Sequence, residues 1–516
     1  MINAKFTIKN YRCFSDERPL EFIFRDGFTA FVGPNNSGKS FILKFFYEFR
    51  NVWNILRNSN LNNLVQNNEI GIDFIKVIDK SDVFHRFNNR EIQVSIDIGN
   101  LRFQFHIVKQ DNINARLRKG IFSLNGQALP PGPVDINTKI FQPGNQSSID
   151  ITSLLGVFEV AAQSIYIPAF RNAVNIGADQ EYYDISIGEA FIRSFGQWKL
   201  GHYSSQSQRI QDVTEDIKSL FEYKSLEINP SDDRKSIHLT IDGKVYKLHE
   251  VGSGIAQFIL VFVNVALKKP TFILIDEPEL NLHPALQQKF LTSLTAYSEN
   301  GVLFATHSLG LARSIGDRIY SVTKNGDSSV VKPFESTPNY AEFLGELNFS
   351  AFQELGVEKI LLVEGVTEVK IFHQFLRMKN KDKNFVVLPL GGDSMINGKR
   401  SQELADIKRI SPKVYCWIDS EKKSENSVLP RNRKSFLDIC NKLKIKTRAS
   451  EKRSIEYYFT ERAIKKVNGD NCSIPAPYEK FDQSKHWVKE NNWRIAREMD
   501  FKEIQDTDLG EFIVRI

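Results

Sequence analysis

The sequence predicts an α/β protein with two domains, each built around a parallel β-sheet. Its 516 residues are too many for one ordinary hydrophobic core. The segments TFILIDEP (271–278) and GVLFATHS (301–308) are nearly continuous apolar runs, which are typical of parallel strands buried on both faces. Beyond Asn348, strand and helix patterns alternate, which predicts a second parallel sheet. We therefore expect domains at residues 1–345 and 346–516.

The composition is that of a folded protein without a membrane span. Hydrophobic residues make up 41% of the chain and charged residues 25%, which excludes a disordered chain. The longest nearly apolar run, Ala256–Leu267, is shorter than the roughly 18 residues that a spanning helix needs. The N-terminus has no signal-peptide core, so we expect a cytoplasmic protein without a membrane partner. The four cysteines form no CxxC pair, which argues against a zinc site or disulfide framework.

Local patterns place the elements of both domains. The first is expected to contain strands at 21–33, a half-exposed strand meander at 91–108, a helix at 41–56, polar helices at about 181–224 within an insert near 177–224, and a hairpin at 236–248 that turns at Asp242-Gly243. The second is expected to contain a strand at 358–365, a helix at 367–378, a strand at 384–390, a helix at 401–410 and a strand at 413–419. The insert is expected to make protein contacts.

Charge is unevenly distributed along the chain. The formal net charge is +6, but the segment from Arg377 to Arg453 has a strong excess of lysine and arginine, so the remainder is net acidic. A basic segment suggests a polyanion such as nucleic acid, because phosphate neutralisation dominates that kind of binding. The alternative is a solvated lysine-rich surface with no such partner.

A phosphate-binding loop lies near the N-terminus. Residues 33–40, Gly-Pro-Asn-Asn-Ser-Gly-Lys-Ser, fit GxxxxGK[ST], follow an apolar strand and open a helix. In such a loop the backbone N–H groups cradle the phosphates, Lys39 reaches the β- and γ-phosphates, and the Ser40 hydroxyl binds Mg²⁺. The sequence therefore predicts an ATP site with Mg²⁺, whose nucleotide-binding residues are Asn35, Asn36, Ser37, Gly38, Lys39 and Ser40.

Two acidic residues follow the apolar strand at 271–275. A parallel sheet delivers side chains at its carboxyl edge into the ligand crevice, so Asp276 can hold Mg²⁺ there. Glu277 is then placed to polarise the attacking water as a general base. Alone, Asp-Glu-Pro after a strand is a common turn. It indicates an ATP site only together with the phosphate-binding loop at 33–40.

The second domain carries two acidic pairs at strand ends. Glu364 ends one strand and Glu368 lies in the first turn of the following helix, while Asp419 and Glu421 flank the tip of another strand. Clustered carboxylates repel one another unless cations lie between them, and oxygen ligands suit Mg²⁺ or Mn²⁺. The alternative reading treats each acid separately, as a helix N-terminal charge or a turn residue.

The first domain resembles the ABC ATPases. The segment 10–14 (NYRCF) is similar to an N-terminal motif whose arginine, here Arg12, approaches the nucleotide; 250–257 (EVGSGIAQ) resembles the signature loop, although LSGGQ is only partly kept; and 280–284 (LNLHP) resembles the D-loop. His307 resembles the switch histidine that contacts the γ-phosphate. The resemblance implies that Ser253 acts on ATP held by another subunit, and so a homodimer or higher homo-oligomer formed through this domain. Gln142 and Gln163 both remain candidates for the Q-loop.

The second domain resembles Toprim domains, which are Rossmann-like parallel sheets with Glu-Gly-x-x-Glu followed by Asp-x-Asp. Glu421 replaces the second aspartate. An ABC ATPase with a C-terminal Toprim domain resembles the OLD (overcoming lysogenization defect) nucleases, which include the Gabija nuclease subunit and some retron effectors. The segments 166–171 (YIPAFR) and 453–458 (RSIEYY) also resemble that family, and the second implies that Glu456 is a further metal ligand. Lys480 and Lys485 are both candidates for a catalytic lysine.

These resemblances imply an ATPase that controls a metal-dependent endonuclease, acting on DNA in defence against phage. Hydrolysis promoted by Glu277 and His307 would gate phosphodiester cleavage at Glu364 and Asp419. Partner subunits of a defence system would fit this role. One alternative is an ATPase sensor whose Toprim domain cleaves RNA such as tRNA. Another is a Toprim domain that binds nucleic acid without cleaving it.

Overall fold

A computed structural model describes residues 2–516 except 78, 89, 112–113, 170–180, 202–203, 232–235, 281, 335–358, 392–403, 406, 409–410, 412, 473–474 and 477. The chain divides into two compact units. Unit 1 comprises Met1–Leu282, Ser293–His307 and Arg318–Phe334, and unit 2 comprises His283–Thr292, Ser308–Asp317 and Glu335–Ile516. The expected boundary at 345/346 lies outside the described residues. Two short segments that precede it in the chain, 283–292 and 308–317, belong to unit 2.

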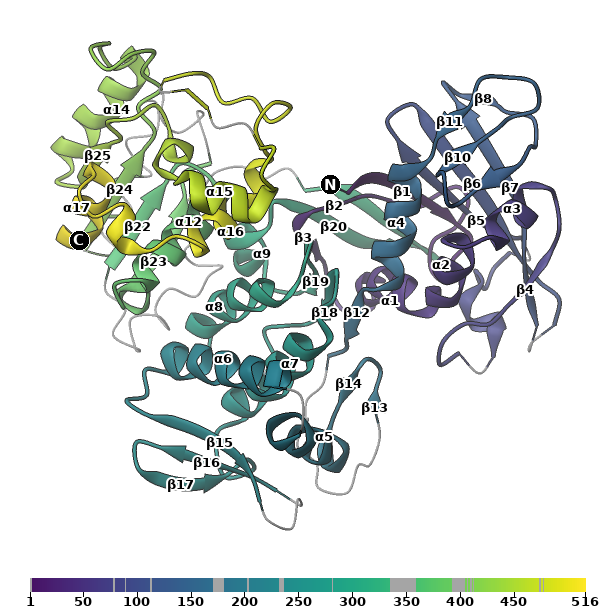
Figure 1. Ribbon diagram of the computed structural model, residues 1–516, viewed down its shortest axis with the longest axis horizontal. Coiled ribbons are helices and arrows are strands. Elements are labelled where there is room, and N and C mark those ends of the chain that lie inside the picture. The colour runs from purple at the N-terminus through teal and green to yellow at the C-terminus, as the bar shows by residue number, and fades with distance from the viewer. Residues whose placement is uncertain are drawn as a thin grey trace. The chain divides into compact units, whose positions relative to one another are not determined.

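Unit 1 contains a six-stranded sheet that carries the phosphate-binding loop. Its strand order is β12-β18-β19-β3-β20-β21, with bounds Ile165–Ile167, Phe272–Asp276, Gly301–Thr306, Gly27–Val32, Arg318–Asn325 and Ser328–Pro333. All neighbouring strands are parallel except β20 and β21. Every residue of β18 and β19 is buried, as their apolar runs predict. Helix α1 (Lys39–Glu48) packs against β18 and β19 (Figure 1).

A second, antiparallel sheet in unit 1 confirms the predicted meander. Its main path is β2-β1-β5-β6-β7-β4, with bounds Leu20–Arg25, Asn3–Lys9, Ile92–Ile98, Leu101–Lys109, Ala115–Leu124 and Ile70–Ile72, and β8 (Gln127–Ala128) pairs with β7. The predicted helix at 41–56 is two helices, α1 and α2 (Arg50–Leu56), which meet at Phe49. Phe49 leaves helical geometry with ψ at 9°, and its ring packs against Phe45 and Phe74. Tertiary packing of an aromatic residue thus overrides the continuous helical pattern.

The remaining part of unit 1 contains the predicted helical insert. It begins with a short hairpin, β13 (Glu181–Tyr182) and β14 (Ile185–Ser186), before helices α5 (Gly188–Leu200) and α6 (Ser204–Phe221). Strands β15 (Leu226–Pro230), β16 (Ile237–Ile241) and β17 (Lys244–Lys247) form an antiparallel sheet. Asp242 and Gly243 both have positive φ, at 49° and 79°, so the predicted Asp-Gly turn is confirmed. Helix α7 (Ser253–Lys268) follows.

Unit 2 contains the second parallel sheet, in the order β23-β22-β24-β25, with bounds Phe385–Pro389, Lys359–Val363, Lys413–Ile418 and Lys446–Ala449. Strand β22 sends Leu361 and Val363 into one core and Ile360 and Leu362 into another, so both faces of the sheet are covered. The helices of this unit include α8 (Pro284–Leu294, which ends beyond it), α9 (Leu309–Ile315), α12 (Val366–Arg377), α14 (Arg431–Lys442), α15 (Glu461–Asn468), α16 (Asn492–Arg497) and α17 (Asp508–Arg515). The predicted helix at 401–410 lies largely outside the described residues. No described helix is both long and apolar enough to cross a membrane.

Candidate functional site

The loop between β3 and α1 has the backbone that phosphate binding requires. Gly38 precedes α1 with φ at 103°, and Asn36 has φ at 60°. A Cβ on Gly33 would lie 2.0 Å from the Val322 carbonyl oxygen, so only glycine fits at this position. The N–H groups at the start of α1 and the positive end of its dipole face the loop, as in an anion site. The predicted context of the motif, strand then loop then helix, is confirmed.

Lys39 is held inside this loop. Its Nζ donates to the carbonyl oxygens of Gly33, at 2.8 Å, and Pro34, at 2.9 Å, and lies 3.5 Å from His307 Nε2. Burial lowers the pKa of Lys39, and the nearby carboxylates of Glu277 and Asp276 oppose that change. The ammonium therefore lies within the loop that is expected to bind phosphates.

Asp276 lies at the end of β18, where the sequence predicts a magnesium ligand. Burial raises its pKa, while a hydrogen bond from Ser40 lowers it. Its Oδ1 is buried and accepts no hydrogen bond from the described residues. A buried carboxylate oxygen without a donor fits a cation, and the Ser40 hydroxyl beside it supplies a second oxygen ligand. The two predicted Mg²⁺ ligands are thus brought together.

Glu277 and His307 face each other across neighbouring strand ends. Glu277 has φ at 47°, and its N–H donates to the Ala305 carbonyl at 2.8 Å. Its Oε1 lies 2.8 Å from His307 Nε2. Glu279, which the sequence reasoning missed, accepts hydrogen bonds from the His307 N–H, at 2.8 Å, and the Thr306 hydroxyl, at 2.6 Å. The second glutamate of Glu-Pro-Glu is the signal that could have revealed it.

Arg12 lies close to the loop but binds a carboxylate. Its Nη2 is 2.5 Å from Glu48 Oε1, and its guanidinium lies over the Phe41 ring at 4.8 Å. The adjacent Cys13 sulfur lies 2.6 Å from the position that a Cβ on Gly38 would take. The segment 10–14 therefore packs against the loop, while the Arg12 charge is directed at Glu48.

The other expected ATPase residues lie as follows. Ser253 is exposed at the start of α7, and Asn281 of the D-loop-like segment lies outside the described residues. Gln142 is hydrogen-bonded to Gln146, and Gln163 to Glu159 at 3.2 Å. Neither contact identifies a Q-loop.

Unit 2 gathers four carboxylates from three separate segments. Glu364 follows β22, Glu368 lies in the first turn of α12, Asp419 follows β24, and Glu456 lies in a short 3₁₀ helix at Ile455–Tyr458. The Asp419 N–H donates to Glu364 Oε2 at 3.2 Å. Asp419 is 5% exposed and Glu456 only 1%. We call Glu364, Glu368, Asp419 and Glu456 the acidic cluster.

The acids of this cluster perturb one another strongly. Burial raises the pKa of Glu368 to about 7, and the charge of Glu456 adds to the effect. Burial also raises the pKa of Asp419 well above its usual range, followed by repulsion from Glu364 and Glu456. Carboxyl groups raise one another's pKa in this way only when they lie close together, so these acids are near one another, as the sequence predicts.

Two cations lie among these carboxylates, and the sequence reasoning identified neither. Lys489 Nζ is 2.9 Å from Glu456 Oε1, and Arg433 Nη2 is 2.8 Å from Glu364 Oε1. Burial favours neutral Glu456, but the Lys489 charge and the Ser454 hydroxyl lower its pKa. Lys480 and Lys485, the candidates from sequence, are both exposed. Lys489 has no motif around it that could have marked it.

Glu421 is not directed at the acidic cluster in the same way. Its backbone is left-handed, with φ at 55°, and its carboxylate accepts from Arg453 Nη2 at 3.0 Å. The side chain is 42% exposed. The predicted pair of strand-end acids is therefore split, with Asp419 pointing inward and Glu421 pairing with Arg453.

The donor set of the acidic cluster fits a divalent cation of the Mg²⁺ or Mn²⁺ kind. Four carboxylates face two cationic side chains, and the buried Asp419 Oδ1 accepts no hydrogen bond from the described residues. Oxygen ligands and excess negative charge are what such ions require. Within the described part of the chain, no three Asp, Glu, His or Cys side chains are already spaced to hold a metal ion. Binding would therefore require the side chains to close in.

Family models match the N-terminal part of the chain. Residues 1–156 match "AAA ATPase domain", and residues 133–313 match "AAA domain, putative AbiEii toxin, Type IV TA system". A curated relative, "Uncharacterized ABC transporter ATP-binding protein YthP" of Bacillus subtilis (strain 168), is 37% identical over 67 residues. That match covers 13% of this chain and 28% of the relative. This part of the chain is thus similar to AAA ATPase domains, and its sheet, loop and helix have a mixed α/β P-loop arrangement.

Solved structures give a partial likeness. The "SMC head domain from Thermotoga maritima" is 18% identical with a TM-score of 0.35, and the alignment covers 65% of this chain and 100% of that one. An Smc head domain with an extended coiled coil, bound to the C-terminal domain of ScpA and derived from Pyrococcus furiosus, is 14% identical with a TM-score of 0.34. That alignment covers 69% of this chain and 99% of the other.

Proposed function

We propose that the chain is an ATP-hydrolysing, metal-dependent nuclease in which the ATP site of unit 1 controls phosphodiester cleavage at the acidic cluster of unit 2. The observation that carries the nuclease proposal is the acidic cluster itself. Four carboxylates from three segments of the chain lie together, three of them buried, although this arrangement costs them repulsion and desolvation. Sites that hold such strain are enriched in function. The resemblance of 364–368 and 419–421 to Toprim domains supports the same reading.

At the ATP site each residue has a specific task. Lys39 would exchange its two carbonyl contacts for phosphate oxygens, and Ser40 and Asp276 would hold the Mg²⁺ that accompanies ATP. Glu277 would take a proton from the attacking water. His307, 2.8 Å from Glu277, would orient that carboxylate and contact the γ-phosphate.

At the acidic cluster the reaction is hydrolysis, in which water attacks phosphorus and the ester bond to one sugar oxygen breaks. A bound divalent ion lowers the pKa of water and neutralises charge on the leaving oxygen. Glu364, Glu368, Asp419 and Glu456 would hold such ions. Lys489 places a positive charge beside the same site, where a substrate phosphate could replace part of its contact with Glu456.

A buried contact within unit 2 suggests how control passes between the sites. The chain runs directly from His307 into α9, which packs against α12, the helix that carries Glu368. Asp317, just after α9, forms a 2.6 Å ion pair with Lys370 of α12, and both side chains are buried. Movement of the His307 segment on ATP hydrolysis would thus be transmitted to α12.

The biological role that we propose is defence against foreign nucleic acid, with DNA as the substrate. One matched family model is described as a putative toxin of a toxin–antitoxin system, which fits an effector of this kind.

The exposed Ser253 at the start of α7 would act on ATP held by a second copy, which supports a homodimer. The pairing of Glu421 with Arg453 favours a second candidate function, in which unit 2 binds nucleic acid without cleaving it.

A cleavage assay separates these functions. Purified protein with Mg²⁺ or Mn²⁺ is expected to nick plasmid DNA, and Glu364→Gln should reduce nicking by roughly a hundredfold or more, whereas Lys502→Met, at an exposed position of unit 2, should leave it unchanged. Intact plasmid beside degraded tRNA would replace DNA with RNA as the substrate. Binding of either without cleavage would favour the second candidate function.

The ATPase proposal has its own test. Lys39→Ala is expected to reduce phosphate release from ATP to background, because the ammonium that neutralises the β- and γ-phosphates is lost. The exposed Lys269→Ala is a matched control in the same unit and should retain full turnover. Equal phosphate release from both variants would rule out this account of the ATP site.

A further inference from the structure

Unit 2 has a cavity of about 600 Å³ at the open edge of its parallel sheet. It lies against the edge strand β25, with α14 and α17 also contributing side chains. Four basic side chains line it, namely Lys444, Lys446, Arg448 and Arg515, and the rings of Tyr415 and Phe512 form part of its wall. None of the lining side chains is acidic. We call this cavity the basic edge pocket.

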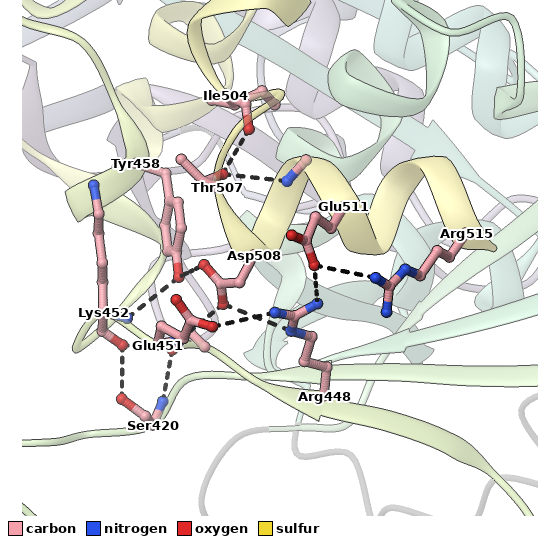
Figure 2. Close-up of polar contacts among 12 residues, drawn as sticks. Ser420, Arg448, Glu451, Lys452, Tyr458, Ile504, Thr507, Asp508, Glu511 and Arg515 are labelled. Atoms are coloured by element: carbon pink, nitrogen blue, oxygen red, sulfur yellow. Dashed lines mark hydrogen bonds and ion pairs between the residues drawn. The ribbon is translucent and has the colours of Figure 1, made fainter.

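The positive charge of the basic edge pocket is only partly neutralised. Figure 2 shows that Arg448 is held between Glu451, Asp508 and Glu511, and that Arg515 lies beside Glu511. Arg448 is therefore compensated, and its guanidinium is fixed in place. The Arg515 side chain, in contrast, is 74% exposed. Its Nη2 lies 3.5 Å from Glu511 Oε2, an oxygen that also pairs with Arg448.

The two lysines carry the excess charge. Lys444 and Lys446 are exposed, and neither forms an ion pair with any described residue. Their charges, after burial, lower the pKa of the neighbouring Lys408. Like charges held close together repel one another. Water screens this repulsion at the surface, and a bound anion would relieve it further.

The geometry favours an extended phosphate ligand. An edge strand presents unpaired backbone N–H groups, and the pocket adds cationic and amide donors beside it. Tyr415 of β24 lies four residues before Asp419, which follows that strand, and four residues correspond to about 13 Å of extended chain. A nucleic-acid backbone cleaved at the acidic cluster would reach the pocket about four base pairs away at roughly 3.4 Å per step.

We propose that the basic edge pocket binds backbone phosphates of the nucleic acid on which the acidic cluster acts. This proposal rests on the proposed nuclease function and names where its substrate is held. Lys444, Lys446 and Arg515 contact the phosphates, and Arg448 forms the fixed floor of the pocket. Contacts of this kind position the substrate without reading its sequence.

The test is DNA binding by a charge-reversed pocket. Lys444→Glu/Lys446→Glu is compared with Lys434→Glu/Lys442→Glu, which changes net charge equally at exposed residues of α14 that do not line the pocket. Fluorescence anisotropy with a 20-base-pair duplex in EDTA measures affinity without cleavage. The pocket variant should bind the duplex roughly tenfold more weakly. The slope of log K for binding against log salt concentration should become less negative by about two. The control should change less than threefold, and both variants should keep the wild-type melting temperature.

Each outcome decides between the proposals. Equal weakening of both variants, or no duplex binding by wild type, would overturn the pocket proposal. Competition by inorganic phosphate or adenosine monophosphate at micromolar concentration would also overturn it, because the pocket would then be a small-ligand site. Wild type that binds duplex through the pocket but cleaves nothing with Mn²⁺ would leave the pocket proposal standing and defeat the nuclease function.

Discussion

At the acidic cluster, two cationic side chains, Arg433 and Lys489, form ion pairs with two of the four carboxylates. Lys489 is the one whose charge lowers the pKa of Glu456 and opposes the raised pKa of Asp419. Burial opposes the charged form of Lys489, yet the surrounding acids raise its pKa. Lys489 therefore supplies positive charge to the acidic cluster.

We expect Lys489→Met to destabilise unit 2 when divalent ions are absent. The Lys489 side chain is 37% exposed and Glu456 is buried, so removing this partner should cost about 1–3 kcal/mol, because the buried carboxylate is left without its donor. The melting transition in EDTA should fall by roughly 5 °C, and 5 mM Mn²⁺ should restore part of that loss. Lys485→Met, an exposed lysine of the same segment, is the control. Equal melting temperatures for the two variants would contradict the role of Lys489.

His373 predicts a pH dependence of stability. Burial, followed by repulsion from Lys289, lowers its pKa from 6.5 to about 4 in the folded state. The folded state thus binds fewer protons than the unfolded state, so stability is unaffected by this residue above about pH 6.5 and is lost progressively as the pH falls from 6.5 to 4. At pH 5.5 wild type should have lost roughly 1.4 kcal/mol through this residue.

Denaturant unfolding at pH 7.5 and 5.5 measures that loss. His373→Gln should remove about 1.4 kcal/mol of the difference between the two pH values, whereas His249→Gln, at an exposed position, should keep it. The same pH dependence in wild type and His373→Gln would show that the imidazole is not buried in its neutral form.

At the scale of elements, α9 and α12 are joined by the Asp317–Lys370 ion pair, whose side chains are 9% and 2% exposed. Lys370→Met should lower the free energy of unfolding by a few kcal/mol, since a charge is left in a buried place. Asp317→Leu/Lys370→Met should recover much of that loss. If ATP control passes through these helices, the double variant should cleave DNA at a rate that no longer responds to ATP. A retained ATP response would exclude this route.

The sequence predicted those elements whose pattern is local. Strands β18, β19, β22 and β24 are continuous apolar runs, and the Asp242-Gly243 turn needs only its own two residues. Strand β25 was missed because its four residues, KTRA, carry no apolar alternation and lie at a sheet edge. The place of residues 308–317 in unit 2 depends on contacts with α12, more than fifty residues later, which no local pattern reveals.

The candidate sites divide in the same way. Glu364, Asp276 and Asp419 were predicted because carboxyl ends of parallel strands converge. Lys489 and Arg433 were missed because each reaches the acidic cluster from a segment without a motif. Local backbone geometry also turned Glu421 toward Arg453, and the spacing of acids in the chain cannot encode that.

At the scale of the whole molecule, the proposed function joins an ATP site in unit 1 to a site for phosphodiester chemistry in unit 2. The ATPase part rests on a complete loop, on Ser40 and Asp276 as predicted magnesium ligands, and on the matched family models. The rest depends on whether the acidic cluster accepts divalent ions. Without that property, neither cleavage nor its control by ATP has a chemical basis.

Titration calorimetry with Mn²⁺ in the absence of nucleotide tests this most directly. Wild type and Asp276→Asn, which alters only the ATP site, should both bind Mn²⁺ with dissociation constants below about 1 mM, equivalent to at least 4 kcal/mol. Asp419→Asn should lose that binding, because it removes the buried carboxylate whose Oδ1 accepts no hydrogen bond from the described residues. The same heat of binding in Asp419→Asn as in wild type, or no binding by wild type, would contradict the account.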